Sequence, residues 1–474
     1  MNSNCAVFGC SITNRYTTMD TKALRQKILD LAIHGKLVPQ DPNDEPASVL
    51  LERIKAEKER LIKEGKIKRS KKSAKTSDTP HYENVPFEVP SSWVWCRLED
   101  IAYVASGSTP DKTCFVENGV PYIKMYNLRN QKIDFAYHPQ YITEEVHNGK
   151  LQRSRTEVGD LIMNIVGPPL GKLAIIPTTL PQANFNQAAV LIRPYKFKEV
   201  LVSYLKVYLE EMSEINSIAT RGSAGQVNIS LTQSQNMRIP IPPLNEVRRI
   251  IEEVSKYDIL IDSLKQNITD IQNLIAYTKS KILDLAIHGK LVPQDPNDEP
   301  AIELLKRINP DFTPCDNGHY TQLPEGWAIC KMKQITSITN GKSQKNVETL
   351  NGIYPIYGSG GVIGRANQYL CIAGSTIIGR KGTINNPIFV EEHFWNVDTA
   401  FGLKANDAIL DKYLYYFCLS FDFSKLDKST AMPSLTKTSI GNVLIPIPPY
   451  KEQERIVAKI DMVLDTMNEI LRAV

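Results

Sequence analysis

Three short motifs resemble catalytic or phosphate-binding loops, and none of them is complete. Gly167–Lys172 (GPPLGK) is one residue shorter than a phosphate-binding loop, and Leu173 stands where Ser or Thr would bind magnesium. Gly358–Gly364 (GSGGVIG) has Ile363 at the third glycine position of a dinucleotide-binding loop. Asn386–Phe389 (NPIF) lacks the second proline of an amino-methyltransferase loop. The sequence therefore favours a binding protein over an enzyme.

Polar side chains on glycine-rich segments could instead read DNA. Base recognition needs Arg, Lys, Asn, Gln and Ser on loops that reach base edges, with glycines that bring the backbone close to phosphate. The DNA-binding candidates in two stretches, 81–243 and 317–449, are Lys124, Asn127, Arg129, Arg153, Arg155, Asn164, Asn186, Gln187, Arg221, Ser223, Gln226, Asn228, Lys342, Gln344, Lys345, Tyr357, Ser359, Arg365, Arg380, Lys381, Lys428 and Ser434. A net charge of +4 over 474 residues does not by itself favour nucleic acid. For any single candidate, an ordinary solvated side chain is the competing interpretation.

Composition indicates a soluble globular protein that binds no metal or cofactor. Apolar residues make up 42% and charged residues 23% of the chain, and no apolar run approaches the length of a membrane span. The histidines are scattered and the cysteines form no CxxC pair, so we expect reduced cytoplasmic thiols. Residues 1–18 lack the cationic start of a secretory signal, and we expect them to be an extension outside the fold.

A long amphipathic stretch, Leu244 to Gly289, must position these segments. Apolar residues recur at spacings of three and four, which predicts a coiled-coil helix. The seam, with a single polar member, is Val247, Ile250, Val254, Tyr257, Ile261, Leu264, Ile268, Ile271, Ile275, Thr278, Ile282 and Leu285. At about 1.5 Å per residue the helix would be roughly 65 to 70 Å long.

Pieces of this helix and its flanks recur elsewhere in the chain. Lys27–Ala47 is repeated without a change as Lys281–Ala301, and the IPIPP segment before the helix recurs as Ile445–Pro449. The N-terminal copy places Leu24, Ile28 and Leu31 on the seam. In this alignment Val474 corresponds to Ile268 and Met19 to Asn273, so the two termini together rebuild the central helix. We therefore predict two antiparallel coiled-coil helices related by a pseudo-twofold axis.

Two dissimilar segments lie between the repeated sequences, and they share a few short motifs in the same order. PSSW at Pro90–Trp93 matches PEGW at Pro324–Trp327, and short β-branched runs alternate with helical segments near 200–215 and 410–421. We predict two mixed α/β heads on a duplicated scaffold. The predicted limits are an extension 1–18, a helical region with a Lys-rich linker 19–80, a first head 81–243, a central coil 244–316, a second head 317–449 and a final helix 450–474.

The N-terminal region holds a predicted helix and a basic segment. Val49–Ile67 has the pattern of a charged helix, for which Asp44 is a candidate N-cap. Lys63–Lys75 is rich in lysine and could lie on DNA phosphates or be a solvated linker. The unchanged repeat also has two explanations, either constraint by a shared partner or recombination between the copies.

These repeats and the motifs YPIYGSGGVIG (Tyr354–Gly364), TIIGRKGTI (Thr376–Ile384) and WNVDTAFGL (Trp395–Leu403) resemble the specificity subunit of type I restriction-modification enzymes over essentially 19–474. The resemblance implies a non-catalytic subunit whose heads each read one half of a split, asymmetric DNA site. Its helices would fix the spacer and dock two methyltransferase subunits, and two restriction/translocase subunits would join in the full complex.

The resemblance also implies that the chemistry belongs to partners, which would use S-adenosylmethionine, ATP and Mg²⁺. Candidate docking residues are His34, Lys36, Leu37, His288, Lys290 and Leu291. Two alternatives remain, a degenerate nuclease or methyltransferase and a coiled-coil scaffold that binds proteins through both heads. Activity of the chain alone would favour the first, and absence of sequence-selective DNA binding would favour the second.

Overall fold

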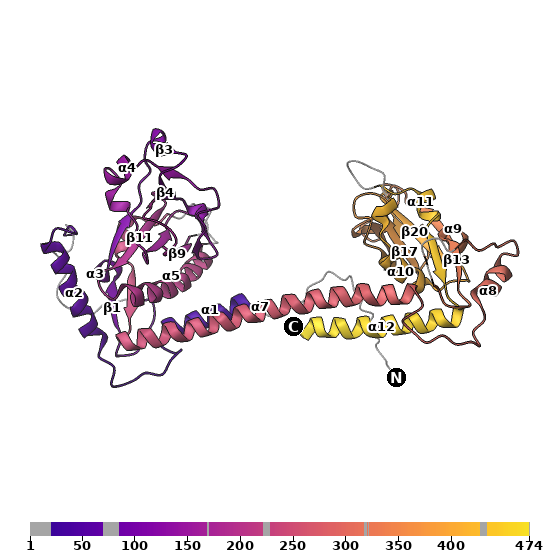
Figure 1. Ribbon diagram of the computed structural model, residues 1–474, viewed down its shortest axis with the longest axis horizontal. Helices are drawn as coiled ribbons and strands as arrows, with labels where there is room; N and C mark the ends of the chain where they lie inside the picture. The colour runs from indigo at the N-terminus through magenta and orange to yellow at the C-terminus, as the bar shows by residue number, and fades with distance from the viewer. Residues whose placement is uncertain are drawn as a thin grey trace. The chain divides into compact units, whose positions relative to one another are not determined.

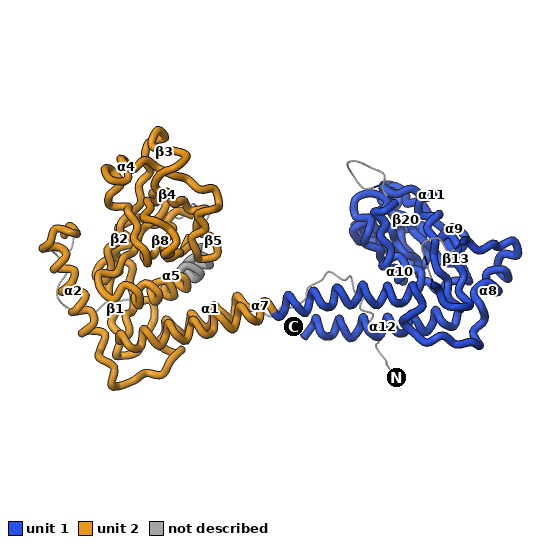
Figure 2. Tube along the Cα trace, in the orientation of Figure 1, with its two compact units in different colours: residues 1–19, 267–474 blue, residues 20–266 orange. Residues whose placement is uncertain are grey.

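A computed structural model describes residues 20–69, 85–167, 170–220, 228–316, 320, 322–426 and 434–473. The described chain divides into two compact units, which Figure 2 colours separately. Unit 2 contains residues 20–266, and unit 1 contains the residues that follow, from 267 onward. Both units combine helices with β-sheets, as the sequence predicts (Figure 1).

Unit 2 carries the first head. Its helices are α1 (Thr21–Ile33), α2 (Ala47–Lys63), α3 (Leu98–Ile101), α4 (Glu144–Asn148), α5 (Lys198–Thr220), α6 (Leu231–Gln235) and the first part of α7 (Leu244–Ile287). Its strands are β1 (Val94–Arg97), β2 (Ala102–Ser106), β3 (Phe115–Val116), β4 (Val120–Ile123), β5 (Leu128–Arg129), β6 (Lys132–Ile133), β7 (Tyr141–Ile142), β8 (Leu161–Asn164), β9 (Leu173–Ile175), β10 (Asn184–Phe185), β11 (Ala189–Pro194) and β12 (Arg238–Ile241).

Two four-stranded sheets build this head, in the orders β2-β11-β8-β9 and β10-β4-β7-β3. Strand β11 is buried along most of its length and pairs antiparallel with β2 and β8, and α5 packs on β11 and β9. The antiparallel pair β1-β12 joins the start of the head to its end. Both ends of the head therefore meet at the scaffold.

Unit 1 carries the second head. Its helices are the rest of α7, α8 (Ala301–Ile308), α9 (Met332–Ile335), α10 (Asp411–Ser420), α11 (Lys437–Gly441) and α12 (Tyr450–Ala473). Its strands are β13 (Ala328–Lys331), β14 (Thr336–Asn340), β15 (Tyr354–Gly358), β16 (Gly361–Ala366), β17 (Ser375–Gly379), β18 (Ile388–Val390), β19 (Trp395–Asn396), β20 (Ala400–Ala405) and β21 (Leu444–Ile447).

The second head repeats the frame of the first. Strands β14-β20-β17-β18 form one sheet and β16-β15-β19 another, while β13 pairs with β21 as β1 pairs with β12. Helix α10 takes the place of α5 but has 10 residues instead of 23. The predicted helical segments near 200–215 and 410–421 are therefore confirmed, together with the mixed α/β class.

The predicted central helix is α7, which has 44 residues and a length of roughly 66 Å at about 1.5 Å per residue. In unit 2 α1 runs antiparallel to its first part, because Arg25 pairs with Asp258 while the later Asp44 pairs with the earlier Arg249. In unit 1 α12 shares a hydrophobic core with the last turns of α7. The pseudo-twofold arrangement of the whole molecule stays a prediction.

The predicted seam needs correction at several positions. Leu24 is 41% exposed and Tyr257 36% exposed, although both were expected to be buried between helices. Near the end of α7 the buried residues are Leu283 and Ala286, which lie one position beyond the predicted Ile282 and Leu285. The burial of Leu283 and Ala286 has a physical reason, because this end of α7 packs on the head of unit 1 as well as on α12 and its apolar face is wider than a coiled-coil seam.

The predicted N-cap of the helix after the first repeat is wrong. Helix α2 begins at Ala47 and its N-cap is Pro46, whose side chain makes no capping bond. Asp44 instead binds the guanidinium of Arg249 at 2.6 Å. The carboxylate is therefore used to attach the repeated segment to α7.

Candidate nucleic-acid interface

In unit 2 the candidate residues gather where strands from both sheets end. Gly107, after β2, donates its N–H to Ala189 O at 3.0 Å, and Ser108 N–H donates to Phe185 O at 3.1 Å. Asn186, after β10, donates its N–H to Ile123 O at the end of β4, at 3.1 Å. We call the surface formed there by Ser108, Lys124, Arg153, Asn186, Gln187 and Asn228 the strand-end surface of unit 2.

Two further contacts bring distant segments to this surface. The Arg153 guanidinium donates to Ser108 Oγ at 3.2 Å. Asn228 forms an isolated β-bridge with Val166, which follows β8. Lys124, Arg153, Asn186, Gln187 and Asn228 were all predicted from the sequence, whereas Ser108 was not. Its only signal was the neighbouring Gly107.

Unit 1 has a corresponding strand-end surface. Gly341 N–H donates to Ala400 O at 3.0 Å, and Lys342 N–H donates to Asn396 O at 3.0 Å. Arg380, after β17, donates its N–H to Thr399 O at 2.7 Å, and Lys381 forms a β-bridge with Ser434. This surface comprises Lys342, Tyr357, Arg380, Lys381 and Ser434, all of which were predicted. Asn396 is buried beneath it, and its side chain donates to Ala400 O within the head.

The two surfaces share their backbone and differ in their side chains. The glycines after β2 and β14, Gly107 and Gly341, both lie so close to a neighbouring carbonyl that a methyl group would overlap it. Unit 2 presents mainly amides and a hydroxyl, with Lys124 and Arg153 as its cations. Unit 1 presents three cations beside one another. The same frame can therefore approach phosphate in both units while offering different groups to bases.

Three predicted DNA contacts have structural roles instead. Asn127 is 1% exposed, and its side chain binds Lys124 N at 2.9 Å and Tyr137 O at 2.7 Å. Asn164 is 2% exposed and accepts from Lys172 N. The Arg155 guanidinium donates to the backbone of α4 at His147 O and to Asn148 Oδ1. Such side chains hold loops in place and do not reach a base from these positions.

The remaining described candidates lie on loops or hairpins beside the strand-end surfaces. Arg129, on the β5-β6 hairpin, stacks over the Tyr137 ring at 4.0 Å. Ser359 lies in the turn between β15 and β16, and the exposed Arg365 lies on β16. Gln344 and the exposed Lys345 follow β14. Four further candidates, Arg221, Ser223, Gln226 and Lys428, lie outside the described residues.

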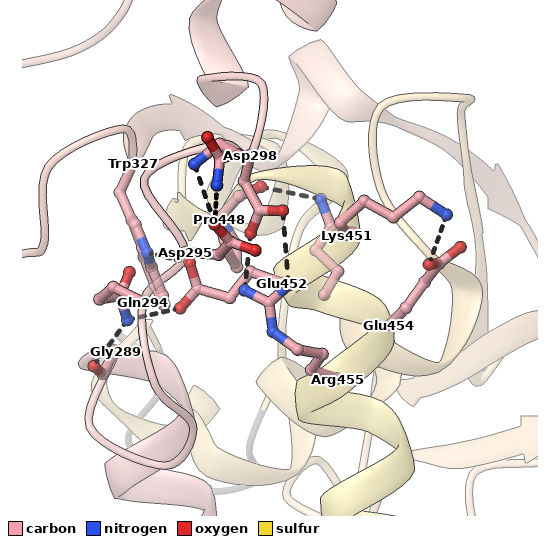
Figure 3. A network of polar contacts seen from close by, with 12 residues as sticks. Gly289, Gln294, Asp295, Asp298, Trp327, Pro448, Lys451, Glu452, Glu454 and Arg455 are labelled. Carbon is pink, nitrogen blue, oxygen red and sulfur yellow. Dashed lines mark hydrogen bonds and ion pairs between the residues drawn. The ribbon is translucent and has the colours of Figure 1, made fainter.

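A polar clasp attaches the second repeat to α12 in unit 1 (Figure 3). Glu452 is 1% exposed and accepts hydrogen bonds from Gln294 Nε2 at 2.8 Å and from Trp327 Nε1 at 3.0 Å. Arg455, one turn later, pairs with Asp298 at 2.6 Å. Burial raises the pKa of Glu452, and the hydrogen bonds from Gln294 and Trp327 oppose this rise.

The same clasp recurs in unit 2. Glu246 accepts from Gln40 Nε2 at 2.5 Å and from Trp93 Nε1 at 3.0 Å, while Arg249 pairs with Asp44. Burial again raises the pKa of the Glu246 carboxyl. Sequence reasoning missed both glutamates. Their signal was a Glu at the same distance after each IPIPP segment.

The predicted docking residues are partly used inside the units. His34 Nδ1 lies 2.7 Å from Asp30 O and its ring packs on Phe87, and His288 Nδ1 lies 2.8 Å from Asp284 O. Leu37 and Leu291 pack against the hydrophobic cores of their units. The exposed members of the set are Lys36 and Lys290.

The GPPLGK segment joins the antiparallel strands β8 and β9, as a turn should; Pro168 and Pro169 lie outside the described residues. Within the described ranges, no three of His, Cys, Asp and Glu are grouped to hold a metal ion. None of the described helices has the length and apolarity needed to span a bilayer.

The family model of the type I restriction modification DNA specificity domain matches residues 90–273 and 324–474, which include most of both heads and the glutamates of both clasps. The chain belongs to this specificity family. The EcoAI specificity subunit of Escherichia coli is 28% identical over 95% of this chain and 90% of its own length. The EcoEI specificity subunit of the same organism is 31% identical over 66% of this chain and 61% of its own length.

Solved structures related to the specificity family share this fold. A chain from a structure of the assembly and conformational transition of the type I R-M system has a TM-score of 0.58 at 20% identity, with 82% of this chain and 94% of that chain covered. The HsdS subunit of Thermoanaerobacter tengcongensis has a TM-score of 0.52 at 18% identity, with coverage of 82% and 93%.

Proposed function

We propose that this specificity-family chain reads a bipartite, asymmetric DNA site, with one half recognised by each unit. The observation that supports this proposal is that the two heads share backbone contacts at their strand ends but present different side chains there. The backbone contacts of Gly107 recur at Gly341, but the exposed groups beside them differ. Because base identity is read by the donors and acceptors of side chains, unlike surfaces imply unlike half-sites.

The scaffold fixes the spacing and receives the partners. The two clasps attach identical repeats to α7 and α12, so they offer two equivalent surfaces to two copies of one methyltransferase subunit. Two restriction/translocase subunits complete the complex. The catalytic groups, with S-adenosylmethionine, ATP and Mg²⁺, belong to those subunits, and this chain contributes DNA recognition in the cytoplasm.

Methyl transfer by purified components tests this function. The chain alone, the methyltransferase subunit alone and the two together are incubated with DNA and labelled S-adenosylmethionine. We expect methylation only with both proteins and only at one sequence. Methylation or cleavage by the chain alone would favour the degenerate enzyme. Assembly without any sequence preference would favour a protein-binding scaffold.

A substitution on the strand-end surface of unit 1 tests for a phosphate contact. Lys381→Ala in unit 1 removes an exposed cation, so we expect weaker binding and a salt dependence reduced by about one phosphate contact. Lys306→Ala, at an exposed position of α8 in the same unit, is the matched control for lost charge and should leave the salt dependence unchanged.

A further inference from the structure

The β15-β16 hairpin of unit 1 exposes two adjacent β-branched residues. Val362 is 51% exposed and Ile363 is 55% exposed. Neighbouring residues of a regular strand point to opposite faces, so one of them should be covered. The pairing shifts from Ile356↔Gly364 to Tyr357↔Val362, which makes Ile363 the extra residue of a β-bulge. The bulge therefore directs both apolar side chains to solvent.

The end of this hairpin adjoins the cations of the unit 1 strand-end surface. Tyr357 O, one residue before the end of β15, accepts from Val397 N at 2.9 Å. Residues on either side of Val397 contact two of the cations, because Lys342 N–H donates to Asn396 O and Arg380 N–H donates to Thr399 O. A DNA backbone held by these cations would pass beside the hairpin.

The hairpin is slender at its tip. A Cβ atom added at Gly360 or Gly361 would meet nothing within 4 Å, and Gly361 has φ +127°, which side-chain-bearing residues rarely adopt. The outer edge of β16 pairs with the 347–349 segment at Arg365 and Ala366, and β19 pairs with β15 at Ile356 and Tyr357. The tip from Gly358 to Val362 therefore projects beyond its sheet as a two-stranded ribbon, a shape that the major groove of B-DNA admits.

We propose that the β15-β16 hairpin enters the major groove at the half-site of unit 1 and that Val362 and Ile363 contact thymine methyl groups. The inference rests on the proposed function and deepens it by assigning a readout to one unit. Apolar side chains recognise the thymine methyl, the one apolar group that base edges present there. The glycines allow the backbone of the turn to pass close to the bases.

Unit 2 has no equivalent hairpin among its described residues. The chain after β4, the counterpart of β15, forms the short β5-β6 hairpin, whose turn residue Gln131 accepts from Leu173 N at 2.8 Å. That hairpin is bound to its own head. Thymine-methyl readout by this mechanism is therefore confined to the half-site of unit 1.

Binding by the assembled complex with its methyltransferase subunits tests the proposal. The probe is a duplex that carries the sequence methylated in the host, and the variants are Val362→Ser and Ile363→Ser. Ile372→Ser is the matched control, because Ile372 is 46% exposed but precedes β17. It therefore lies at the opposite end of that strand from Arg380 and the strand-end surface. We expect about tenfold weaker binding for the hairpin variants, which is the size of one lost base contact. The salt dependence should not change because no charge is removed.

Uracil in place of thymine identifies the group that is contacted. Removing the methyl groups from the half-site of unit 1 should weaken binding by the wild-type complex and should have little effect on the Val362→Ser complex. Hairpin variants that bind like Ile372→Ser would overturn the proposal, as would equal effects of uracil on both complexes. A wild-type complex without any sequence preference would instead overturn the proposed function itself.

Discussion

Glu246 and Glu452 show at the level of single residues why two distant copies of one sequence fold alike. Each carboxylate is about 1% exposed and accepts from a Trp indole and a Gln amide of the segments packed against it. A buried carboxylate with two such donors favours one arrangement of the packed segments. Removing it leaves both donors unsatisfied at a cost of roughly 1 to 3 kcal/mol. The clasp thus determines how each repeat lies on its helix.

Glu452→Gln tests the pH dependence of the clasp. Burial raises the pKa of Glu452 above its unfolded value, so the folded state binds the proton more tightly. The stability from this group is present below the unfolded pKa and is lost as the pH rises through the folded pKa. We expect the wild-type free energy of unfolding, measured with urea, to fall relative to that of the variant as the pH rises above about 4, the ordinary pKa of a Glu carboxyl. The control is Glu454→Gln on the exposed side of α12, and parallel pH profiles would contradict the prediction.

The matched glycines predict a second residue-level effect. A methyl group at Gly341 would overlap Val397 O, so Gly341→Ala must displace the loop that carries Lys342. We expect relaxed recognition of one half-site, and Gly107→Ala should relax the other. At Gly441 an added methyl would meet the side chains of Lys333 and Ile338, at 3.2 and 3.6 Å, and no backbone carbonyl, so Gly441→Ala is the control. Methylation of substrates altered in each half-site measures the effect, and equal losses at both halves would count against it.

The sequence predicted the location of the surfaces better than the role of each side chain. Lys124, Arg380 and Lys381 reach the strand-end surfaces because they follow strands that could be recognised by their β-branched residues. Asn127 was misassigned, because an Asn in a polar loop has the same sequence signal whether it faces solvent or binds backbone groups. Burial of this kind depends on tertiary contacts that a local pattern does not contain.

Helices α5 and α10 distinguish the two units at the level of elements. In unit 2 α5 carries Glu210, which pairs with Arg25 of α1, and Arg25 also binds Asp258 of α7 at 2.9 Å. The corresponding residues of unit 1 are Lys279 and Leu419, and Lys279 forms no ion pair with any described residue. A cavity of about 670 Å³ lies there between α7, α10 and α12.

Arg25→Ala should therefore destabilise unit 2 more than Lys279→Ala destabilises unit 1. The side chains of Arg25 and Glu210 are 25% and 12% exposed, so the loss leaves two partly buried carboxylates without their cation. We expect a cost of about 1 to 2 kcal/mol for Arg25→Ala, between the values for exposed and buried pairs. Urea unfolding measures both variants, and equal costs would refute the assigned difference.

The unchanged repeat is explained only in part by these elements. Gln40 and Asp44, with their copies Gln294 and Asp298, are needed by the clasps. Lys36 and Lys290 are exposed members of the repeat that take part in neither clasp, so the clasps do not explain why these two residues are identical. A partner surface or recombination between the copies would keep them alike. Freely differing synonymous codons would favour the partner, whereas identical DNA would favour recombination.

At the scale of the whole molecule, α7 passes from one unit into the other as a single helix of 44 residues. Its length should therefore set the distance between the two half-sites. One inserted heptad near Thr269–Gln272 adds about 10 Å of helix, or about three base pairs. We expect the spacer to change by this amount while the bases read stay the same. An unchanged spacer in the sites methylated by this variant would refute the role of α7 as a ruler.

The most direct test of the central claim is methylome sequencing of a host that carries this chain with its methyltransferase subunits. Two unlike heads on one duplicated scaffold predict a single methylated sequence made of two different specified parts with an unspecified spacer of constant length. The methylation should disappear when the chain is deleted. One uninterrupted recognition sequence, or the same methylation without the chain, would contradict the account.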